Sequence, residues 1–214
     1  MLAHGVDGGA PWYAMELVEG PTLATVWARR APTTDATAMR EALHTLERLC
    51  LTLAFLHGEG LVHRDLKPAN VVIRPDGTPV LVDFGFAATF VARGSREVLE
   101  RGGEALGSLA YMAPEQLRGE FVDARADLYA LGCMLYEAVS GAPPFAHLAP
   151  WEVVRAKLSS LPPPPPTAHG LERDPALHRT MLALLAPEPR ARPGYAEDIA
   201  RQLAVGRGDA PSAA

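Results

Sequence analysis

The spacing of apolar residues changes along the chain and divides it into two parts. Residues 12–18 form an apolar run between two segments rich in glycine and proline, which predicts a strand leading into a tight connection. Across residues 39–57, leucines recur at three- and four-residue steps and Gly58 follows, a pattern that predicts an amphipathic helix. We therefore expect β structure early in the chain and mainly helices after it.

Two short β-branched runs follow this helix and indicate a hairpin. They cover residues 71–73 and 80–82, and a Pro-Asp-Gly turn lies between them. Residues 123–139 carry apolar and small side chains on nearly every side, which predicts a helix at the centre of a domain. Shorter helices are predicted at residues 151–160, 175–186 and 195–204. The fold class is therefore α+β.

Proline and small residues mark the connections in the last third of the chain. The proline run at residues 162–166 predicts a stiff connector between two helices, with a polyproline ligand as the alternative. Small residues dominate positions 206–214, which are predicted to form a disordered tail. One domain is expected over residues 1–205.

Composition excludes several classes of protein. With 214 residues, 48% of them hydrophobic and 21% charged, the chain can bury a core of its own. A net charge of -5 provides no basic surface, so nucleic acid is not an expected partner. Cys50 and Cys133 lie in apolar helical patterns and are predicted to be buried packing residues in a reducing, cytoplasmic compartment. No segment of the chain predicts a membrane span.

Candidate chemistry gathers at the two ends of the predicted hairpin. The sequence HRDLKPAN, residues 63–70, precedes the first strand, and DFG, residues 83–85, follows the second. Asn70 and Asp83 offer two hard oxygen ligands that suit a hydrated Mg²⁺. Transfer of a phosphoryl group to a hydroxyl also needs a carboxylate and a cation, which Asp65 and Lys67 provide. The ordered set therefore points to phosphoryl transfer.

These motifs closely resemble the signature set of the eukaryotic-type (Hanks-type) serine/threonine protein kinases. HRDLKPAN and DFG are followed by APE at residues 113–115. Further matches are GSLAYM before the APE, DLYALG in the central helix and RARP near the end of the chain. The resemblance covers nearly the whole chain, and its composition suggests a bacterial member. It implies a protein-kinase-like fold, mainly the helical C-terminal lobe with a hinge strand and a hairpin at the active site.

The resemblance assigns roles to the catalytic residues. Asp65 matches the catalytic base, Lys67 the residue that contacts the transferred phosphate, and Asn70 with Asp83 the Mg²⁺ ligands. ATP, Mg²⁺ and protein substrates with serine or threonine are thereby implied. Lys67 after the catalytic aspartate favours serine and threonine over tyrosine as acceptors.

Further roles fall on the activation segment. Arg64 resembles the arginine that reads a phosphate there, and the available hydroxyls belong to Thr89, Ser95 and Ser108. Ser95 is favoured over Thr89 as the phosphate carrier. Ser108 matches the residue of the substrate loop that touches Asp65 and Lys67.

Structural and adenine-binding residues follow from the same resemblance. Glu115 and Arg192 match a buried ion pair below the substrate loop, and Asp127 matches the helix aspartate that holds the backbone around His63 and Arg64. His63 and Phe84 are expected to stack. The adenine site is implied at Met15 as the gatekeeper, at the backbone of Glu16 and Val18, and at Val72 below the ring.

The family's glycine-rich loop, strand lysine and helix glutamate would all precede residue 12. The glycines in residues 4–9 are instead interpreted as a turn between strands. We therefore expect a chain that lacks most of the N-terminal lobe and transfers phosphate poorly on its own. Two alternatives remain: an inactive half-kinase that binds proteins, and a small-molecule phosphotransferase, which the APE segment and its arginine partner disfavour.

Overall fold

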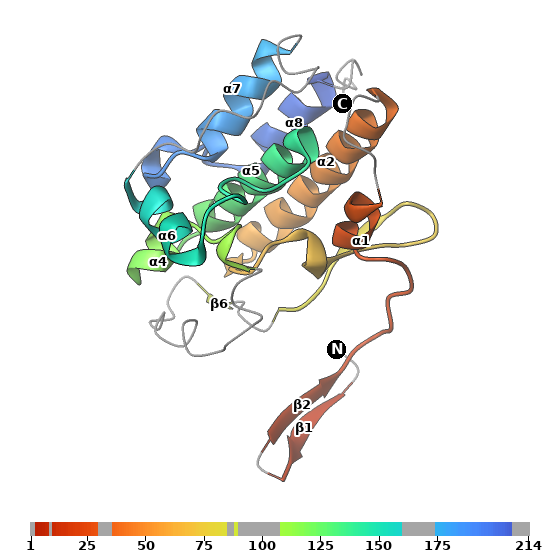
Figure 1. The fold of residues 1–214 in the computed structure, drawn as a ribbon. Coiled ribbons are helices and arrows are strands. Elements are labelled where there is room, and N and C mark those ends of the chain that lie inside the picture. Colours follow the sequence, from red (N-terminus) through yellow and green to blue (C-terminus); the bar gives the residue numbers. More distant parts are fainter. Residues whose placement is uncertain are drawn as a thin grey trace.

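The computed structural model describes residues 3–8, 10–29, 36–84, 88–89, 108–159 and 174–206. Its first element is an antiparallel hairpin of β1 (Ala3–Asp7) and β2 (Ala10–Ala14). Figure 1 shows this hairpin projecting away from the helical body. The strand predicted at residues 12–18 is shifted, because β1 begins at Ala3 opposite Ala14 and the ladder ends there. The turn predicted over residues 4–9 is wrong for residues 4–7, which belong to β1, and the chain turns only after them, at Gly8 with φ of 55°.

An extended segment leads from β2 to the body and meets the β4–β5 hairpin there. Gly20 has φ of 140°, and a Cβ at this position would lie 2.0 Å from the Ile73 carbonyl oxygen. Only glycine permits this close approach. Next to it, the Ile73 N–H donates to the Pro21 carbonyl at 2.9 Å, and Thr22 forms a β-bridge with Val72. The segment is thereby fixed to the hairpin just before the first helix.

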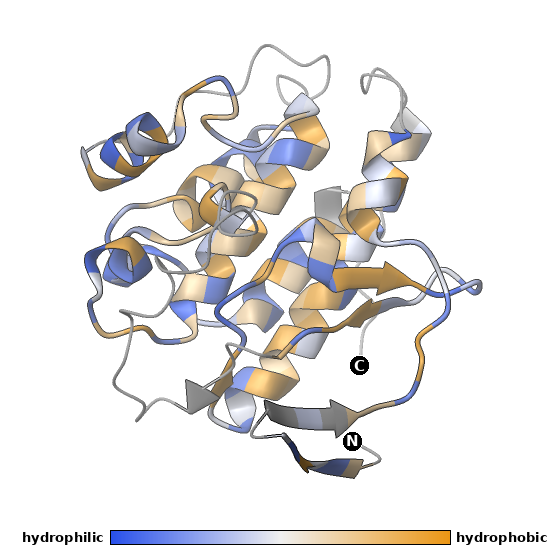
Figure 2. Ribbon diagram, turned by 60° about the horizontal axis from the view of Figure 1, so that its bottom comes forward, coloured by the Kyte–Doolittle hydropathy of each residue, from blue (hydrophilic) through white to orange (hydrophobic). Residues whose placement is uncertain are grey.

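The body of the molecule is helical. Its helices are α1 (Leu23–Ala28), α2 (Ala36–Gly58), α4 (Pro114–Arg118), α5 (Arg125–Ser140), α6 (Pro150–Ser159), α7 (Pro175–Leu184) and α8 (Ala196–Gly206), with 3-10 helices η1 (Pro68–Asn70) and η4 (Pro189–Ala191). The helices α2, α5, α7 and α8 pack side by side (Figure 1). Figure 2 shows their apolar residues gathered along the inner helices. Burial of these faces provides the main stabilisation of the lobe.

α5 is the central helix, as the sequence predicts. Nearly all of its residues from Ala126 to Val139 are buried. A Cβ on Gly132 would lie 2.7 Å from the Leu184 Cβ, so glycine allows α5 and α7 to approach closely. The other predicted helices are also confirmed, with ends shifted by up to a few residues. The α+β fold class is confirmed as well.

Short strand pairs complete the fold on the side of the catalytic motifs. β4 (Val71–Ile73) pairs antiparallel with β5 (Pro79–Leu81), which confirms the predicted hairpin. β3 (Leu61–Val62) pairs with β6 (Ala88–Thr89). The sequence analysis did not predict β1, α1, the β3–β6 pair or α4, because each is too short to show a periodic pattern.

Cys50 and Cys133 are both buried and free, which confirms their predicted role as packing residues. Of the helices that the structure describes, none has both the length and the apolar character that a bilayer span requires. The proline run at residues 162–166, Ser95 and residues 207–214 of the predicted tail lie outside the described residues. Gly206, assigned to that tail, is instead the last residue of α8.

Candidate active site

The candidate active site is centred on residues 63–70, between β3 and β4, which we call the catalytic loop. Lys67 donates through Nζ to Asp65 Oδ2 at 2.8 Å and to the Ser108 hydroxyl at 2.7 Å. Asn70 donates through Nδ2 to the Asp65 carbonyl at 2.8 Å and to Asp65 Oδ2 at 3.0 Å. The side chains of Asp65 and Lys67 are 11% and 17% exposed. The carboxylate is thus held on two sides and still reaches the surface.

Asp127 in α5 fixes the start of the catalytic loop. Its carboxylate accepts the backbone N–H of His63 and that of Arg64, both at 2.9 Å. His57 of α2 donates to the same carboxylate through Nε2 at 2.9 Å. Asp127 is 1% exposed, and a buried carboxylate is costly unless donors surround it. Three donors from two parts of the chain therefore fix the backbone that precedes Asp65.

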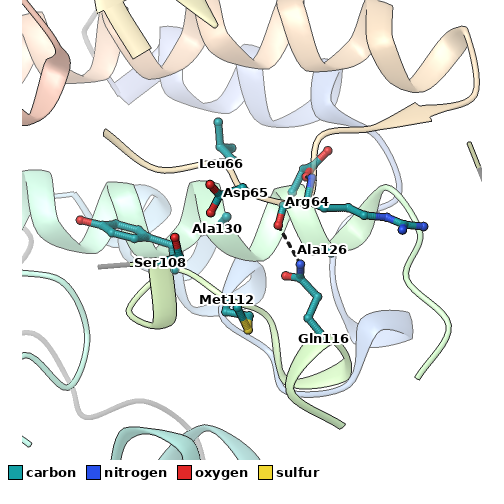
Figure 3. Close-up of a pocket in the computed structure, with 10 residues that line it drawn as sticks. Arg64, Asp65, Leu66, Ser108, Met112, Gln116, Ala126 and Ala130 are labelled. Carbon is teal, nitrogen blue, oxygen red and sulfur yellow. Dashed lines mark hydrogen bonds between the residues drawn. The ribbon is translucent and has the colours of Figure 1, made fainter. Parts of the chain in front are cut away.

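Arg64 has a backbone conformation that depends on these contacts. Its φ of 67° lies in the left-handed region, where residues with a Cβ are disfavoured. Gln116 of α4 donates through Nε2 to the Arg64 carbonyl at 2.8 Å (Figure 3). Asp127 and Gln116 thus hold the N–H and the carbonyl of Arg64. Backbone strain of about 1–3 kcal/mol persists only where the surroundings impose it.

His63 connects the catalytic loop to the residues after β5. Its Nε2 donates to the Val82 carbonyl at 3.2 Å, and its Nδ1 accepts the Asp65 N–H at 3.3 Å. These partners assign the neutral tautomer with the proton on Nε2. The ring also packs edge-on against Phe84, with 5.0 Å between centroids. The contact that the sequence predicts between His63 and Phe84 is therefore present.

Asn70 and Asp83 lie at the same end of the hairpin. The Asn70 carbonyl accepts the Val82 N–H at 2.9 Å, and Asp83 follows with a φ of 62°. Because the Asn70 amide nitrogen faces Asp65, its amide oxygen points away from that residue. An amide oxygen and a carboxylate are hard donors that fit Mg²⁺, which keeps several waters and needs only one or two protein groups.

The donor set does not fit a metal ion enclosed by protein ligands alone. Within the described ranges, no three His, Cys, Asp or Glu residues are arranged to hold a metal ion. A site with two oxygen donors therefore fits a hydrated ion shared with phosphate groups better than a metal enclosed by protein alone.

Residues 108–113, which we call the substrate loop, lie against the catalytic loop. A cavity of about 10 Å³ lies between the two loops, which is roughly enough for one water molecule. Figure 3 shows the side chains that line it. Tyr111 donates through its hydroxyl to Glu137 Oε2 at 2.6 Å. Burial, together with the Glu137 charge, raises the pKa of Tyr111 well above its usual value, and burial raises the pKa of Glu137. The Tyr111 phenol therefore remains a donor.

A buried ion pair supports the substrate loop. Arg192 donates to both carboxylate oxygens of Glu115, at 2.6 Å and 2.8 Å, and the two side chains are 0% and 2% exposed. It also donates to the carbonyls of Ala186, Arg125 and Pro187 at 2.8 Å, 2.9 Å and 3.0 Å. These bonds satisfy the guanidinium, so the pair tolerates its burial.

The residues assigned to adenine binding lie at the edge of the body. Met15 is 48% exposed and Val18 is half-buried, in a segment without regular secondary structure. Glu16 accepts a hydrogen bond from Arg74 at 3.2 Å, across an exposed ion pair. Val72, in β4, is half-buried beside the point where the extended segment crosses. The structure thus brings this segment to the β4–β5 hairpin.

The activation segment is described only in part. Ser95 lies outside the described residues, while Thr89 belongs to β6. Arg64 Nε is buried and has no hydrogen-bond partner within the described part of the chain. A buried guanidinium nitrogen without an acceptor is unfavourable. The Arg64 Nε–H is therefore a hydrogen-bond donor that an acceptor group in the activation segment could satisfy.

Sequence reasoning missed two residues that hold the site, His57 and Gln116. His57 ends an amphipathic helix and is distant in sequence from its partner Asp127. Gln116 also accepts the Ala113 N–H at 2.9 Å, so its position three residues into a helix gave a capping signal. Its second bond, to the Arg64 carbonyl, depends on tertiary packing that no local pattern reveals.

A helical lobe with a carboxylate, an ammonium and an amide held beside a β-hairpin defines a protein-kinase-like class. Comparison with known sequences agrees. The model of the protein kinase domain family matches residues 9–203. The chain therefore belongs to the protein kinase family, as its motifs predict.

Several bacterial serine/threonine-protein kinases are similar to the chain. It is 36% identical over 212 residues to serine/threonine-protein kinase PknB of Mycolicibacterium smegmatis, covering 99% of this chain and 33% of that protein. It is 35% identical to serine/threonine-protein kinase pkn3 of Myxococcus xanthus, covering 92% of this chain and 36% of pkn3. The DNA damage-responsive kinase RqkA of Deinococcus radiodurans is also 35% identical, with coverage of 97% and 30%. The chain spans about a third of the length of these relatives.

Proposed function

We propose that the protein containing this chain transfers the γ-phosphoryl group of ATP to serine or threonine hydroxyls of protein substrates. The observation that carries the proposal is the contact of Lys67 with both Asp65 and Ser108. It joins the candidate base, a cation and the substrate loop in one cluster. A lysine that only carried a solvated charge would not be expected to bond both Asp65 and Ser108.

Each member of the cluster has a distinct chemical task. Asp65 orients the acceptor hydroxyl and takes its proton while the oxygen forms a bond to the γ-phosphorus. The bond between that phosphorus and the bridging oxygen breaks, and ADP leaves with the bonding electrons. Lys67 stabilises the charge on the phosphoryl oxygens as they pass between the two. Ser108 keeps Lys67 and the substrate loop in register.

The remaining assignments place the nucleotide. Asn70 and Asp83 would hold Mg²⁺, which neutralises phosphate charge when it is bound. Met15, with the backbone of Glu16 and Val18, would border the adenine ring. Val72 would cover one face of that ring, which fits its half-buried position in β4.

Arg64 would bind a phosphate group on the activation segment and so allow regulation by phosphorylation. Its buried Nε has no partner within the described residues, and a phosphate on the activation segment would provide one. Ser95 is the proposed carrier. Replacement of Ser95 by alanine would then lower activity without changing the catalytic loop.

We assign residues 1–205 to one protein kinase domain and place the protein in the cytoplasm. The family match over residues 9–203 supports the first assignment. The free, buried Cys50 and Cys133 support the second, because reduced thiols are typical of that compartment.

The test is phosphate transfer from labelled ATP to a protein substrate, followed by analysis of the labelled amino acid. Asp65→Asn removes the base and should lower kcat by roughly 10²–10⁴-fold. Asp76→Asn is the matched control, because Asp76 is an acid in the exposed hairpin turn whose hydrogen bonds come from the neighbouring Thr78. It should leave kcat unchanged.

Two outcomes would contradict the proposal. Label on tyrosine alone would exclude the serine/threonine assignment. Tight binding of Mg·ATP without any transfer by the full-length protein would favour a protein-binding module instead. That residues 1–214 alone transfer phosphate slowly stays a prediction, and the same assay on this chain checks it.

A further inference from the structure

Lys157 in α6 has an environment that is unusual for a lysine. It is 1% exposed, although a lysine on a surface helix normally keeps its ammonium in water. Its Nζ donates to the carbonyl of Ala110 at 2.7 Å and to that of Met112 at 2.8 Å. Both acceptors belong to the substrate loop. α6 therefore reaches the substrate loop through one buried ammonium group.

The groups around this ammonium belong to α5 and to the segment after α7. Nζ lies 5.0 Å from the centroid of the Tyr129 ring, and the Arg192 guanidinium lies 4.9 Å from the same centroid. Cys133 of α5 and Arg192 act electrostatically on Lys157, and Arg192 is itself paired with Glu115 of α4. Burial lowers the pKa of Lys157 to about 8.

The pKa values of its two neighbours on α5 are shifted in the opposite direction. Burial raises the pKa of Tyr129 well above its usual value, and it also raises the pKa of Cys133. Glu137, further along α5, accepts a hydrogen bond from Tyr111, and burial raises the pKa of its carboxyl above the ordinary value. Lys157 therefore loses its proton at lower pH than Tyr129 or Cys133.

The carbonyls that Lys157 holds have functional neighbours. Ser108, two residues before Ala110, bonds Lys67 in the catalytic loop. On its other side, Ala110 is part of the wall of an apolar pocket of about 310 Å³. The pocket is lined also by Leu109, Phe145, Leu148 and Val153. A shift of the Ala110 backbone would change both the pocket and the position of Ser108.

Packing alone does not explain a lysine at this site. An apolar side chain of similar length, such as methionine, would fill the volume without the cost of burying a charge. The two carbonyls would then lose their donors. The feature that lysine adds is a pair of charge-assisted hydrogen bonds to the substrate loop.

We propose that Lys157 is a positioning residue for the protein substrate, because it holds the backbone of Ala110 and Met112 and thereby the wall of the adjacent apolar pocket. This inference rests on the proposed kinase function and specifies how the substrate loop is kept in place. It assigns Lys157 no contact with ATP or with the transferred phosphate. Its loss should therefore affect the protein substrate and not the nucleotide.

The test compares Lys157→Met with Arg155→Met in the full-length protein. Both variants remove a cation from α6, but Arg155 is exposed and lies over Trp151. For Lys157→Met, we expect the KM for a peptide substrate to rise roughly tenfold, because both charge-assisted hydrogen bonds that hold the substrate loop are lost. The KM for ATP and the slow hydrolysis of ATP without peptide should stay within about twofold of the wild type. Arg155→Met should change none of these values.

A measurement on the unmodified protein covers the case in which Lys157→Met does not fold. Between about pH 7 and about pH 9.5, deprotonation of Lys157 should raise the peptide KM while ATP hydrolysis without peptide is unaffected by that step. A peptide KM that does not depend on this titration, or equal KM values for the two variants, would overturn the inference and leave the kinase proposal intact. A wild-type protein with neither peptide phosphorylation nor ATP hydrolysis would instead refute the kinase proposal itself.

Discussion

The catalytic loop and the hinge segment, residues 15–19, are held to the protein in contrasting ways. The catalytic loop is fixed by buried polar groups, since Asp127 receives three hydrogen bonds while 1% exposed. The hinge segment lies on the surface, where Leu17 is 81% exposed. Its polar link to the body is the Glu16–Arg74 ion pair, with side chains 75% and 40% exposed.

The contrast follows from what each region has to position. In the catalytic loop, a carboxylate and an ammonium must stay within hydrogen-bond distance, and buried donors and acceptors fix such geometry best. In the proposed function, the hinge segment would offer backbone groups to a flat ring, for which extended chain suffices. The chain is firmly attached just after the hinge segment, at Gly20 and Pro21, where it crosses β4. Stability of the site should therefore depend on the helical lobe much more than on the hinge.

The largest effect is expected at the buried ion pair. Glu115→Gln leaves the Arg192 guanidinium buried without its carboxylate, and the free energy of unfolding should fall by about 3–5 kcal/mol. Urea unfolding of the variant measures this change. The double variant Glu115→Gln with Arg192→Met serves as the control, because removal of both charges should cost less than the sum of the two single changes. A loss below about 1 kcal/mol would contradict the assigned role of the pair.

A smaller effect is expected where the hinge side joins the body. In Gly20→Ala, the new Cβ would meet the Ile73 carbonyl oxygen, and alanine disfavours a φ of 140°. The segment must then move away from β4, at a cost of roughly 1–3 kcal/mol. Gly77→Ala is the matched control, because its φ of 80° is also positive but nothing lies within 4 Å of its Cβ. If both variants lose equal stability, backbone strain alone and not the close approach explains the Gly20 effect.

The sequence proposes residues for the site more readily than it reveals the contacts that hold them, and the roles of those residues stay predictions. HRDLKPAN and DFG identify Asp65, Asn70 and Asp83 because chemistry restricts which side chains can act there. The long helices were also predictable, since an amphipathic stripe repeats over many residues. The strand predicted at residues 12–18 is instead β2, residues 10–14. It ends at Ala14 because Ala14 pairs with Ala3, the first residue of β1.

The resemblance implied some long-range polar contacts, such as the Glu115–Arg192 pair, but two others were beyond reach for a physical reason. The bond from His57 to Asp127 and the bonds from Lys157 to the substrate loop join residues far apart in sequence. No periodic pattern records such pairs. By pattern alone, Lys157 is a typical cation in the last turn of a surface helix. Burial of its ammonium becomes visible only once α6 has packed on the substrate loop.

Lys157 also gives a prediction with a definite sign in pH. Its pKa in the folded protein is about 8, below the usual value for lysine, so between these values the unfolded chain binds more protons than the native protein. Stability relative to Lys157→Met should therefore increase as pH rises above about 8, by at most about 1.4 kcal/mol per pH unit. Urea midpoints of both proteins at several pH values measure this difference. A difference that falls with pH would show that the charged form is the one favoured by folding.

The smallest effect is expected at the ion pair of the hinge segment. Arg74→Gln removes a charge from a pair whose side chains are largely exposed, and solvent screening leaves such a pair with about 0–1 kcal/mol. We expect the free energy of unfolding to change by less than about 0.5 kcal/mol, and this change should shrink further as salt is added. Urea unfolding of this variant and of Glu115→Gln under the same conditions compares the free energy that each ion pair contributes. A loss at Arg74 close to that at Glu115 would show that the hinge segment is held as firmly as the substrate loop, and the contrast between the two regions would disappear.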